Sequence, residues 1–132
     1  MAALALVALL HPALMLRRGQ PLSRGRKLAV LLSTGMVVVT FLLGSSLYPA
    51  YRRELKEPLV SEAAEIAALF ETKEHIAWLV LTLSLSACCC ALVAPRDATG
   101  LRKLAALTFF IATVATLIAF VLGTVVASVR SF

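Results

Sequence analysis

Charged residues are scarce in this 132-residue sequence, and acidic ones are the scarcest: seven Asp and Glu stand against thirteen Lys and Arg. Hydrophobic residues make up 61% of the chain, well above the roughly 45–50% typical of soluble domains. Four long apolar runs contain no Asp, Glu, Lys or Arg at all, at residues 1–16, 28–48, 76–94 and 104–127. This distribution excludes an ordinary water-soluble fold and predicts that most of the chain is surrounded by lipid.

Motifs of soluble enzymes are also missing. The sequence contains no Gly-rich phosphate loop, no nucleophile elbow and no H-E-x-x-H zinc motif. It has no C-x-x-C pair either, because its three cysteines are consecutive, at positions 88–90. Consecutive residues on a helix point about 100° apart, so these thiols cannot converge on one metal ion and are interpreted as small packing residues. The sequence therefore indicates a protein without catalytic residues of its own.

The apolar runs predict an all-α integral membrane protein, a single domain of four transmembrane helices in an up-down bundle. The last three runs have the length of about 20 residues that a span needs. The first is shorter, since its 16 residues rise only about 24 Å against a hydrocarbon thickness of about 30 Å, and Pro12 weakens its last turns. It lacks the leading charge and the cleavage site of a signal peptide, so we expect a retained helix.

Basic residues gather in the two loops that follow the first and third runs. Residues 17–27 and 96–103 together contain eight Lys and Arg against one Asp, whereas the other segments contain five against six acids. Short loops rich in Lys and Arg stay cytoplasmic, so both termini are predicted on the outer, periplasmic side of a bacterial inner membrane. No aromatic residues are interleaved with the basic ones, which argues against nucleic acid. The expected partners are the lipid bilayer and other membrane subunits.

Residues 49–75 form one polar segment between the second and third runs. Six of the seven acidic residues of the chain lie between Tyr48 and Trp78. Because residues 61–73 contain neither Gly nor Pro and are mostly helix formers, the third helix is predicted to begin near Ser61 and to extend outward as part of a helical hairpin. The predicted docking surface consists of the charged residues of this segment: Arg52, Arg53, Lys56, Glu62, Glu65, Glu71 and Glu74.

The two histidines suggest an alternative, a redox subunit that binds b-type haem. His11 lies near the basic end of the first run and His75 at the outer end of the third, a difference in depth of about 20 Å, so one haem cannot bridge them. A haem or quinone held near His75, with Tyr51 close to it in the outer segment, stays open as the alternative. The sequence does not define the cofactor further, and a structural lipid is equally compatible with it.

A metal site is not predicted. Glu71 and His75 are four residues apart and share a helical face. The Glu-x-x-His spacing of di-iron bundles is absent, however, because Thr72 stands three residues before His75. A zinc ion would need a third ligand from elsewhere, with Glu65 or Glu54 as candidates. Salt bridges from these glutamates to nearby arginines are the simpler interpretation.

In length and in its number of apolar runs, the chain resembles the small four-helix multidrug exporters. The resemblance implies a glutamate embedded in the first helix, and this first run offers only His11. Transport by this chain alone is therefore not expected. The sequence favours a non-catalytic small subunit or accessory protein of a larger inner-membrane complex, which docks through residues 49–75.

Overall fold

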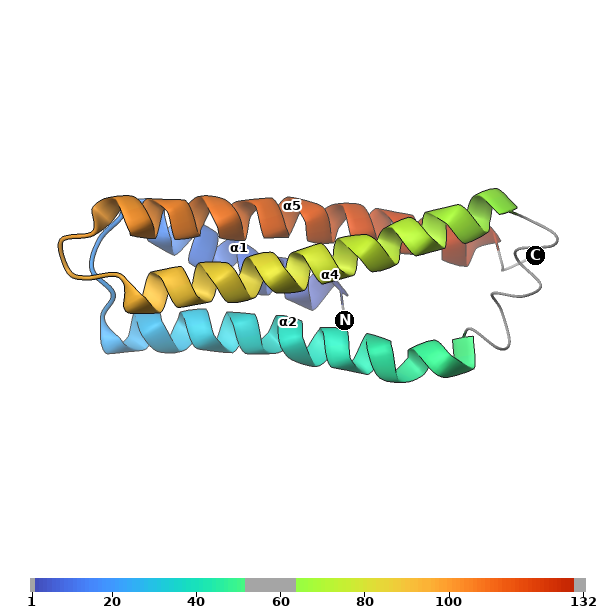
Figure 1. Cartoon of the computed structure of the whole chain (residues 1–132), viewed down its shortest axis with the longest axis horizontal. Coiled ribbons are helices and arrows are strands. Elements are labelled where there is room, and N and C mark those ends of the chain that lie inside the picture. Colours follow the sequence, from blue (N-terminus) through green and yellow to red (C-terminus); the bar gives the residue numbers. More distant parts are fainter. Residues whose placement is uncertain (1, 52–63, 130–132) are drawn as a thin grey trace.

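The computed structural model describes residues 2–51 and 64–129. Its elements are helices α1 (Ala2–Leu16), α2 (Arg24–Tyr51), α4 (Ala64–Val93) and α5 (Thr99–Val129) (Figure 1). Helices α2, α4 and α5 are each long and apolar enough to cross a membrane. The prediction of an all-helical integral membrane protein is confirmed to this extent. The four-span bundle is not confirmed, because the 15 residues of α1 rise only about 22 Å.

The second helix begins earlier than its apolar run, within the basic loop. Ser23 precedes α2 and accepts two hydrogen bonds from its first turn. The Arg26 amide donates to the Ser23 hydroxyl oxygen (3.4 Å), and the Lys27 amide donates to the Ser23 carbonyl oxygen (3.0 Å). A serine in this position satisfies amides that have no partner within the helix. Arg24, Arg26 and Lys27 therefore lie on the first turn of α2 rather than in an irregular loop.

The third predicted span is also longer than its apolar run. Helix α4 is continuous from Ala64 to Val93, so it carries Glu65, Glu74 and His75 on regular helix instead of in a loop. The part before Ile76 rises about 18 Å. The predicted start near Ser61 and the hairpin with the continuation of α2 involve residues outside the described ranges, so the structure does not test them.

The helices pack around a ring in the order α1, α5, α4, α2. The α4–α5 interface is the most extensive and the α2–α4 interface the least. The α1–α2 and α4–α5 loops lie together at one end, called here the loop end (Figure 1). Helix α1 starts well short of the opposite, far end, where α2 finishes and α4 begins (Figure 1). Only the loop-end half of the ring is therefore closed by four helices.

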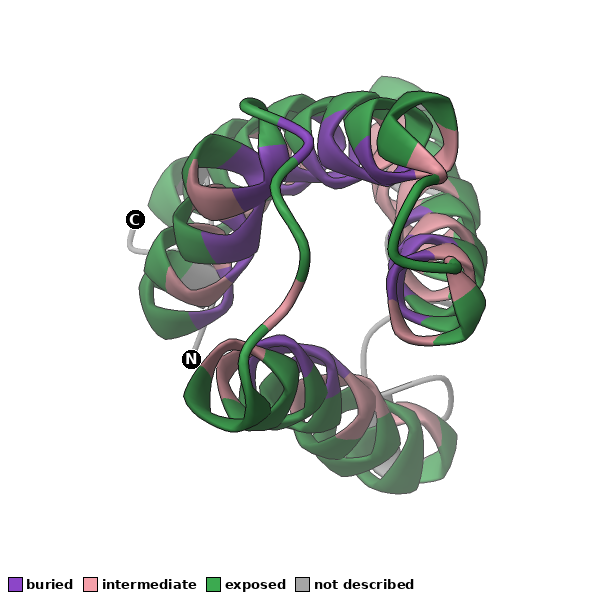
Figure 2. Cartoon of the chain, turned by 90° about the vertical axis from the view of Figure 1, so that its left-hand side faces the viewer, coloured by how far each residue is buried: buried purple, intermediate pink, exposed green. Residues whose placement is uncertain are grey.

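Small residues line the inside of the ring. The core includes Ala87 and Ala91 of α4 and Ala105 and Ala112 of α5, none more than 1% exposed, with the larger Phe109 beside them. Small side chains let two helix backbones approach closely, which explains the extensive α4–α5 interface. Viewed from the loop end, buried residues face inward and exposed ones outward on each helix (Figure 2).

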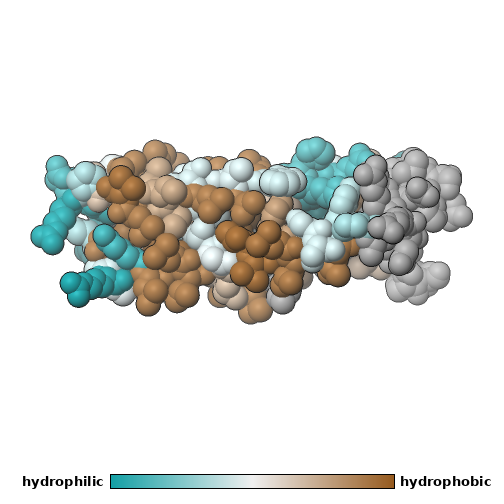
Figure 3. All heavy atoms as spheres, turned by 60° about the horizontal axis from the view of Figure 1, so that its bottom comes forward, coloured by the Kyte–Doolittle hydropathy of each residue, from teal (hydrophilic) through white to brown (hydrophobic). Residues whose placement is uncertain are grey.

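Large apolar side chains cover the outside. Leu32, Leu42, Val93 and Leu107 are more than half exposed, as are several others along α2, α4 and α5. Figure 3 shows a broad apolar belt with more hydrophilic residues towards both ends. A surface of this kind is unfavourable in water and matches the hydrocarbon of a bilayer. The three long helices and this belt together indicate insertion in a membrane.

The two loops at the loop end are joined by one arginine. Arg102, in the first turn of α5, is only 2% exposed. Its guanidinium donates hydrogen bonds to the carbonyl oxygens of Gly19 (Nε, 2.7 Å), Pro95 (2.6 Å) and Arg96 (2.9 Å). Gly19 reaches this position with a φ of +65°, a conformation that suits glycine. The sequence identified Arg102 only as a topology signal, so this contact was not predicted.

Candidate functional site

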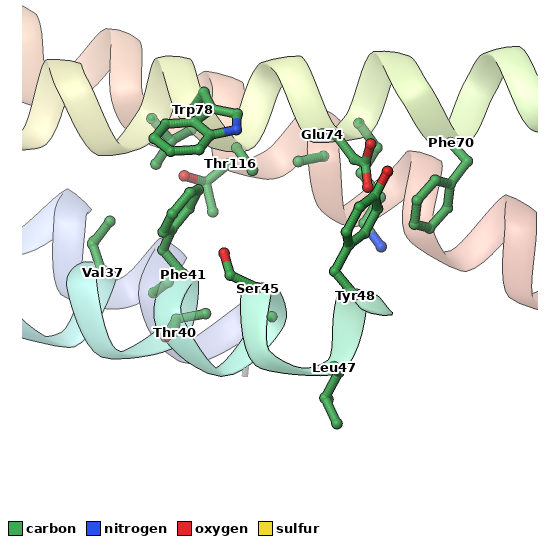
Figure 4. A pocket seen from close by; sticks show the side chains of 16 residues that line it. Val37, Thr40, Phe41, Ser45, Leu47, Tyr48, Phe70, Glu74, Trp78 and Thr116 are labelled. Atoms are coloured by element: carbon green, nitrogen blue, oxygen red, sulfur yellow. The ribbon is translucent and has the colours of Figure 1, made fainter. Parts of the chain in front are cut away.

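A cavity of about 630 Å³ lies between α2 and α4 in the far-end half of the ring. Helix α1 is short and begins at Ala2, so it borders this cavity only near its start, where Ala5 is a lining residue. Figure 4 shows Phe41 and Ser45 of α2 and Trp78 of α4 extending into the space between the two helices. Volumes of about 300–1,000 Å³ are typical of sites for small molecules.

Aromatic side chains line the part of the cavity nearer the loop end. The rings of Phe41 and Trp78 meet edge to face, with centroids 4.6 Å apart and an interplanar angle of 67° (Figure 4). Trp78 is the single tryptophan of the chain. Val37, Ala77 and Val80 add further apolar surface. This part of the cavity suits a hydrocarbon chain or a flat ring.

Polar groups lie at the far-end side of the same cavity. Tyr48 of α2 faces Lys73 and Glu74 of α4 among the lining residues. The Lys73 ammonium lies 5.5 Å from the centroid of the Phe70 ring, a distance at which a cation is attracted to the ring face. It also rests against α5, since a Cβ at Gly123 would lie 3.2 Å from it. Each helix contributes lining residues to this cavity, which is apolar towards the loop end and polar towards the far end.

The structure places some of the predicted docking residues and leaves others out. Glu65, Glu71 and Glu74 lie on α4, the first two exposed and Glu74 half-buried at the cavity. The remaining members, Arg52, Arg53, Lys56 and Glu62, lie outside the described residues. The docking surface as a whole is therefore not tested and stays a prediction.

His75 lies next to the cavity without lining it. It is exposed, and its Nδ1 is 2.8 Å from the carbonyl oxygen of Glu71 one turn earlier. Tyr51 is the last residue of α2, and its side chain is outside the described part of the structure. His11 is exposed on α1. Among the described residues, those that line the cavity include Tyr48 but no His, Cys or Met, which are more common axial ligands of haem.

The cysteines and acidic residues form no metal site in the described ranges. No group of three or more His, Cys, Asp or Glu residues there is arranged to hold a metal ion. Cys88 is buried, Cys90 half-buried and Cys89 exposed, and all three are free thiols. Their different exposures follow from the rotation of about 100° per helical residue.

The sequence analysis did not predict the cavity, and among the lining residues it named only Glu74 as a candidate, for the docking surface. A usable signal was present, since Phe41 and Tyr48 are seven residues apart and Glu74 and Trp78 four apart, spacings that place each pair on one helical face. Which face meets which could not be derived, because the order of helices around the ring is not readable from hydropathy. Tyr48 and Trp78 appeared there only as the limits of the stretch that holds most of the acidic residues.

The fold and the cavity define a helical integral membrane protein with three helices able to span the bilayer. Comparisons of the sequence with protein families and with curated proteins, and a search of solved structures, found no match. The function is therefore argued from the residues alone.

Proposed function

We propose that this chain is a non-catalytic accessory subunit of a larger inner-membrane complex, which docks through the charged segment at the far end. The observation that carries the proposal is the continuity of α4 from Ala64. It holds Glu65 and Glu71 on a rigid helix that continues past the apolar run, with both side chains exposed. Residues 64–75 of α4, called here the docking arm, therefore present a fixed pattern of charges to a partner, which a mobile loop would not.

Charge on such an arm matters more for recognition than for folding. Exposed ion pairs contribute only about 0–1 kcal/mol each to stability. Between proteins, complementary charges select partners and fix their register, and like charges placed together are costly. The docking arm, whose charged residues are mostly acidic, therefore fits a partner with basic residues just outside the membrane.

Site-specific photo-crosslinking tests this proposal. A crosslinking residue at Glu65 should capture a discrete partner protein in native membranes, whereas the same residue at Lys103, exposed at the loop end, should not. Glu65→Lys should reduce co-purification of that partner in mild detergent, and Lys103→Glu should leave it unchanged. Equal capture at both positions, or capture of lipid alone, would contradict docking through the far end.

A second candidate is a quinone-binding redox subunit, and the cavity is the observation that favours it. Its aromatic interior accommodates an isoprenoid chain, and Tyr48, Lys73 and Trp78 supply hydrogen-bond donors for quinone carbonyls. The described lining residues include no His, Cys or Met to ligate haem iron, which favours a quinone over haem in this cavity.

Two glycines of α2 provide a matched test of the second candidate. A side chain added at either Gly44 or Gly35 meets no atom within 4 Å, but only Gly44 lines the cavity. Gly44→Leu should therefore displace a quinone that Gly35→Leu retains, measured by solvent extraction of the purified protein and its oxidised-minus-reduced spectrum. A Soret band would indicate haem instead. If the purified protein contained neither a chromophore nor a quinone, the accessory role would be the candidate that remains.

A further inference from the structure

A second, smaller cavity lies at the loop end and is strongly basic. Its volume is about 280 Å³, and it is bounded by the start of α2, the end of α4 and both loops. Four of its lining residues are cations and none is acidic; the lining residues are Pro21, Leu22, Arg24, Lys27, Ala91, Ala94, Arg96 and Arg102. Cations that converge on one cavity from separate segments produce a local positive potential.

The buried Arg102 strengthens this potential. All three of its hydrogen bonds are to backbone carbonyls, so no carboxylate neutralises the guanidinium through them. A buried charge without a counter-ion is unfavourable, and dipoles compensate it only in part. An anion in the adjoining cavity would supply the missing negative charge. Because the same hydrogen bonds hold the two loops together, the cavity wall is fixed before any ligand binds.

The helix that borders the cavity adds to the effect. Helix α2 is 28 residues long and starts at Arg24, at the cavity. The positive end of its dipole favours an anion there. The remaining lining is apolar, with Leu22, Ala91 and Ala94. Leu28 and Val93, the sequence neighbours of the lining residues Lys27 and Ala94, are 57% and 77% exposed.

We propose that this cavity binds the phosphate-bearing headgroup of an anionic phospholipid from the leaflet at the loop end. The headgroup and free inorganic phosphate share the same chemistry, that of a phosphate anion. The position of the cavity at the edge of the apolar belt favours the lipid, because the acyl chains of a bound lipid can continue along Leu28 and Val93. Basic pockets at the ends of membrane helices are suited to such headgroups. This site is at the opposite end from the proposed docking arm and does not depend on it.

Lipid-dependent thermal stability of the purified full-length chain tests the site. The protein in neutral maltoside detergent is titrated with phosphatidylglycerol, with phosphatidylcholine of the same acyl chains, or with sodium phosphate. A ligand that binds only the folded state raises the unfolding temperature, and the stabilisation grows as RT ln(1 + L/Kd) with the ligand concentration L. Phosphatidylglycerol should stabilise the protein at concentrations where phosphatidylcholine and inorganic phosphate do not.

Charge-matched double variants localise the effect. Arg24→Gln with Lys27→Gln removes two lining cations, and Arg18→Gln with Arg26→Gln removes two cations of the same end that do not line the cavity. One basic residue near a lipid surface is equivalent to about five-fold in affinity, so the first pair should weaken phosphatidylglycerol binding about 30-fold. The second pair should weaken phosphatidylglycerol binding less than three-fold, which is below the roughly five-fold contribution of a single basic residue in contact with the lipid.

Each contrary outcome overturns a defined part of the proposal. Equal weakening by both pairs would mean that lipid responds to overall charge and not to this cavity. Equal stabilisation by phosphatidylcholine would exclude recognition of an anionic headgroup. Stabilisation by inorganic phosphate at the same concentrations as the lipid would assign the site to a free anion. Arg102 is left unchanged in these variants, because its loss would unfold the loops.

Discussion

The guanidinium Nε of Arg102 donates a hydrogen bond of 2.7 Å to the carbonyl oxygen of Gly19, which lies 83 residues earlier in the chain. This bond connects the α1–α2 loop to the first turn of α5. Helices α1 and α5 are thereby held at the loop end by polar contacts as well as by apolar packing. The hydrogen bond between Arg102 and Gly19 therefore fixes the position of the α1–α2 loop relative to α5.

Arg102→Lys should destabilise the fold although it keeps the charge. A lysine ammonium on a flexible stem cannot satisfy three carbonyls in the planar geometry that the guanidinium provides. Hydrogen bonds to charged groups contribute about 1.5–3 kcal/mol each, so we expect a loss of about 3 kcal/mol in the free energy of unfolding. Circular dichroism during denaturant titration in detergent measures it. Arg18→Lys, at an exposed position of the same loop, should be silent, and an equal effect there would contradict the role of Arg102.

Gly19→Ala should destabilise the same contact from the other side. The φ of +65° costs a non-glycine residue about 1–2 kcal/mol, and the new Cβ would lie 2.5 Å from Cγ2 of Thr99. Adding Thr99→Ser removes that methyl group and should recover the steric part of the loss but not the backbone part. Gly25→Ala is the control, since its Cβ meets nothing within 4 Å and the position is helical. We expect it to be neutral or stabilising by up to about 1 kcal/mol.

How far the sequence predicted this fold can be judged from individual helices. The spans of α2, α4 and α5 follow from uninterrupted apolar runs, and the extension of α4 before Ile76 follows from helix formers without Gly or Pro. The first apolar run also showed, by its 16 residues, that α1 is shorter than a full membrane span. The relation of Arg102 to Gly19 was not predictable, because a basic residue next to a span carries the same topology signal whether it is exposed or buried.

The cavity between α2 and α4 could not be predicted for a related reason. Hydropathy identifies which residues lie in the membrane, but in lipid both the inside and the outside of a bundle are apolar. Phe41 and Trp78 therefore look like any other membrane residues until the order of helices is known. The docking prediction rests on the charge pattern of residues 49–75, part of which lies outside the described structure, and it stays a prediction.

Phe41→Leu should weaken the α2–α4 interface, which is the least extensive of the ring. The edge-to-face contact of Phe41 with Trp78 contributes about 0.5–1.5 kcal/mol beyond burial of area. We expect a loss of about 1 kcal/mol and a shift in the emission of Trp78, which reports its surroundings unambiguously because it is the single tryptophan. Phe110→Leu, at a half-exposed position of α5, should change neither quantity. An unchanged emission spectrum in Phe41→Leu would show that the two rings are not in contact.

Cysteine labelling tests the orientation and the status of α1 together. The native cysteines at positions 88–90 are first replaced by alanine, and single cysteines are introduced for Ser23, Thr99, Glu65 or Ala3. Because the loop end carries eight basic residues against one acid, a membrane-impermeant maleimide should modify Ser23→Cys and Thr99→Cys only after lysis, and Glu65→Cys in intact cells. Labelling of the two loop positions from outside would reverse the predicted orientation.

The reactivity of Ala3→Cys decides between three and four spans. Helix α1 ends at the loop end and begins inside the bundle, and its 15 residues are about 8 Å too short for a hydrocarbon thickness of about 30 Å. Because Ala5 lines the far-end cavity, we expect water to reach the beginning of this helix through the polar side of the cavity. Ala3→Cys should then react from the same side as Glu65→Cys, more slowly, and Gly44→Leu should slow it further by filling the cavity. Reaction from the loop side instead would show that α1 does not cross the membrane and that the N-terminus is on the cytoplasmic side.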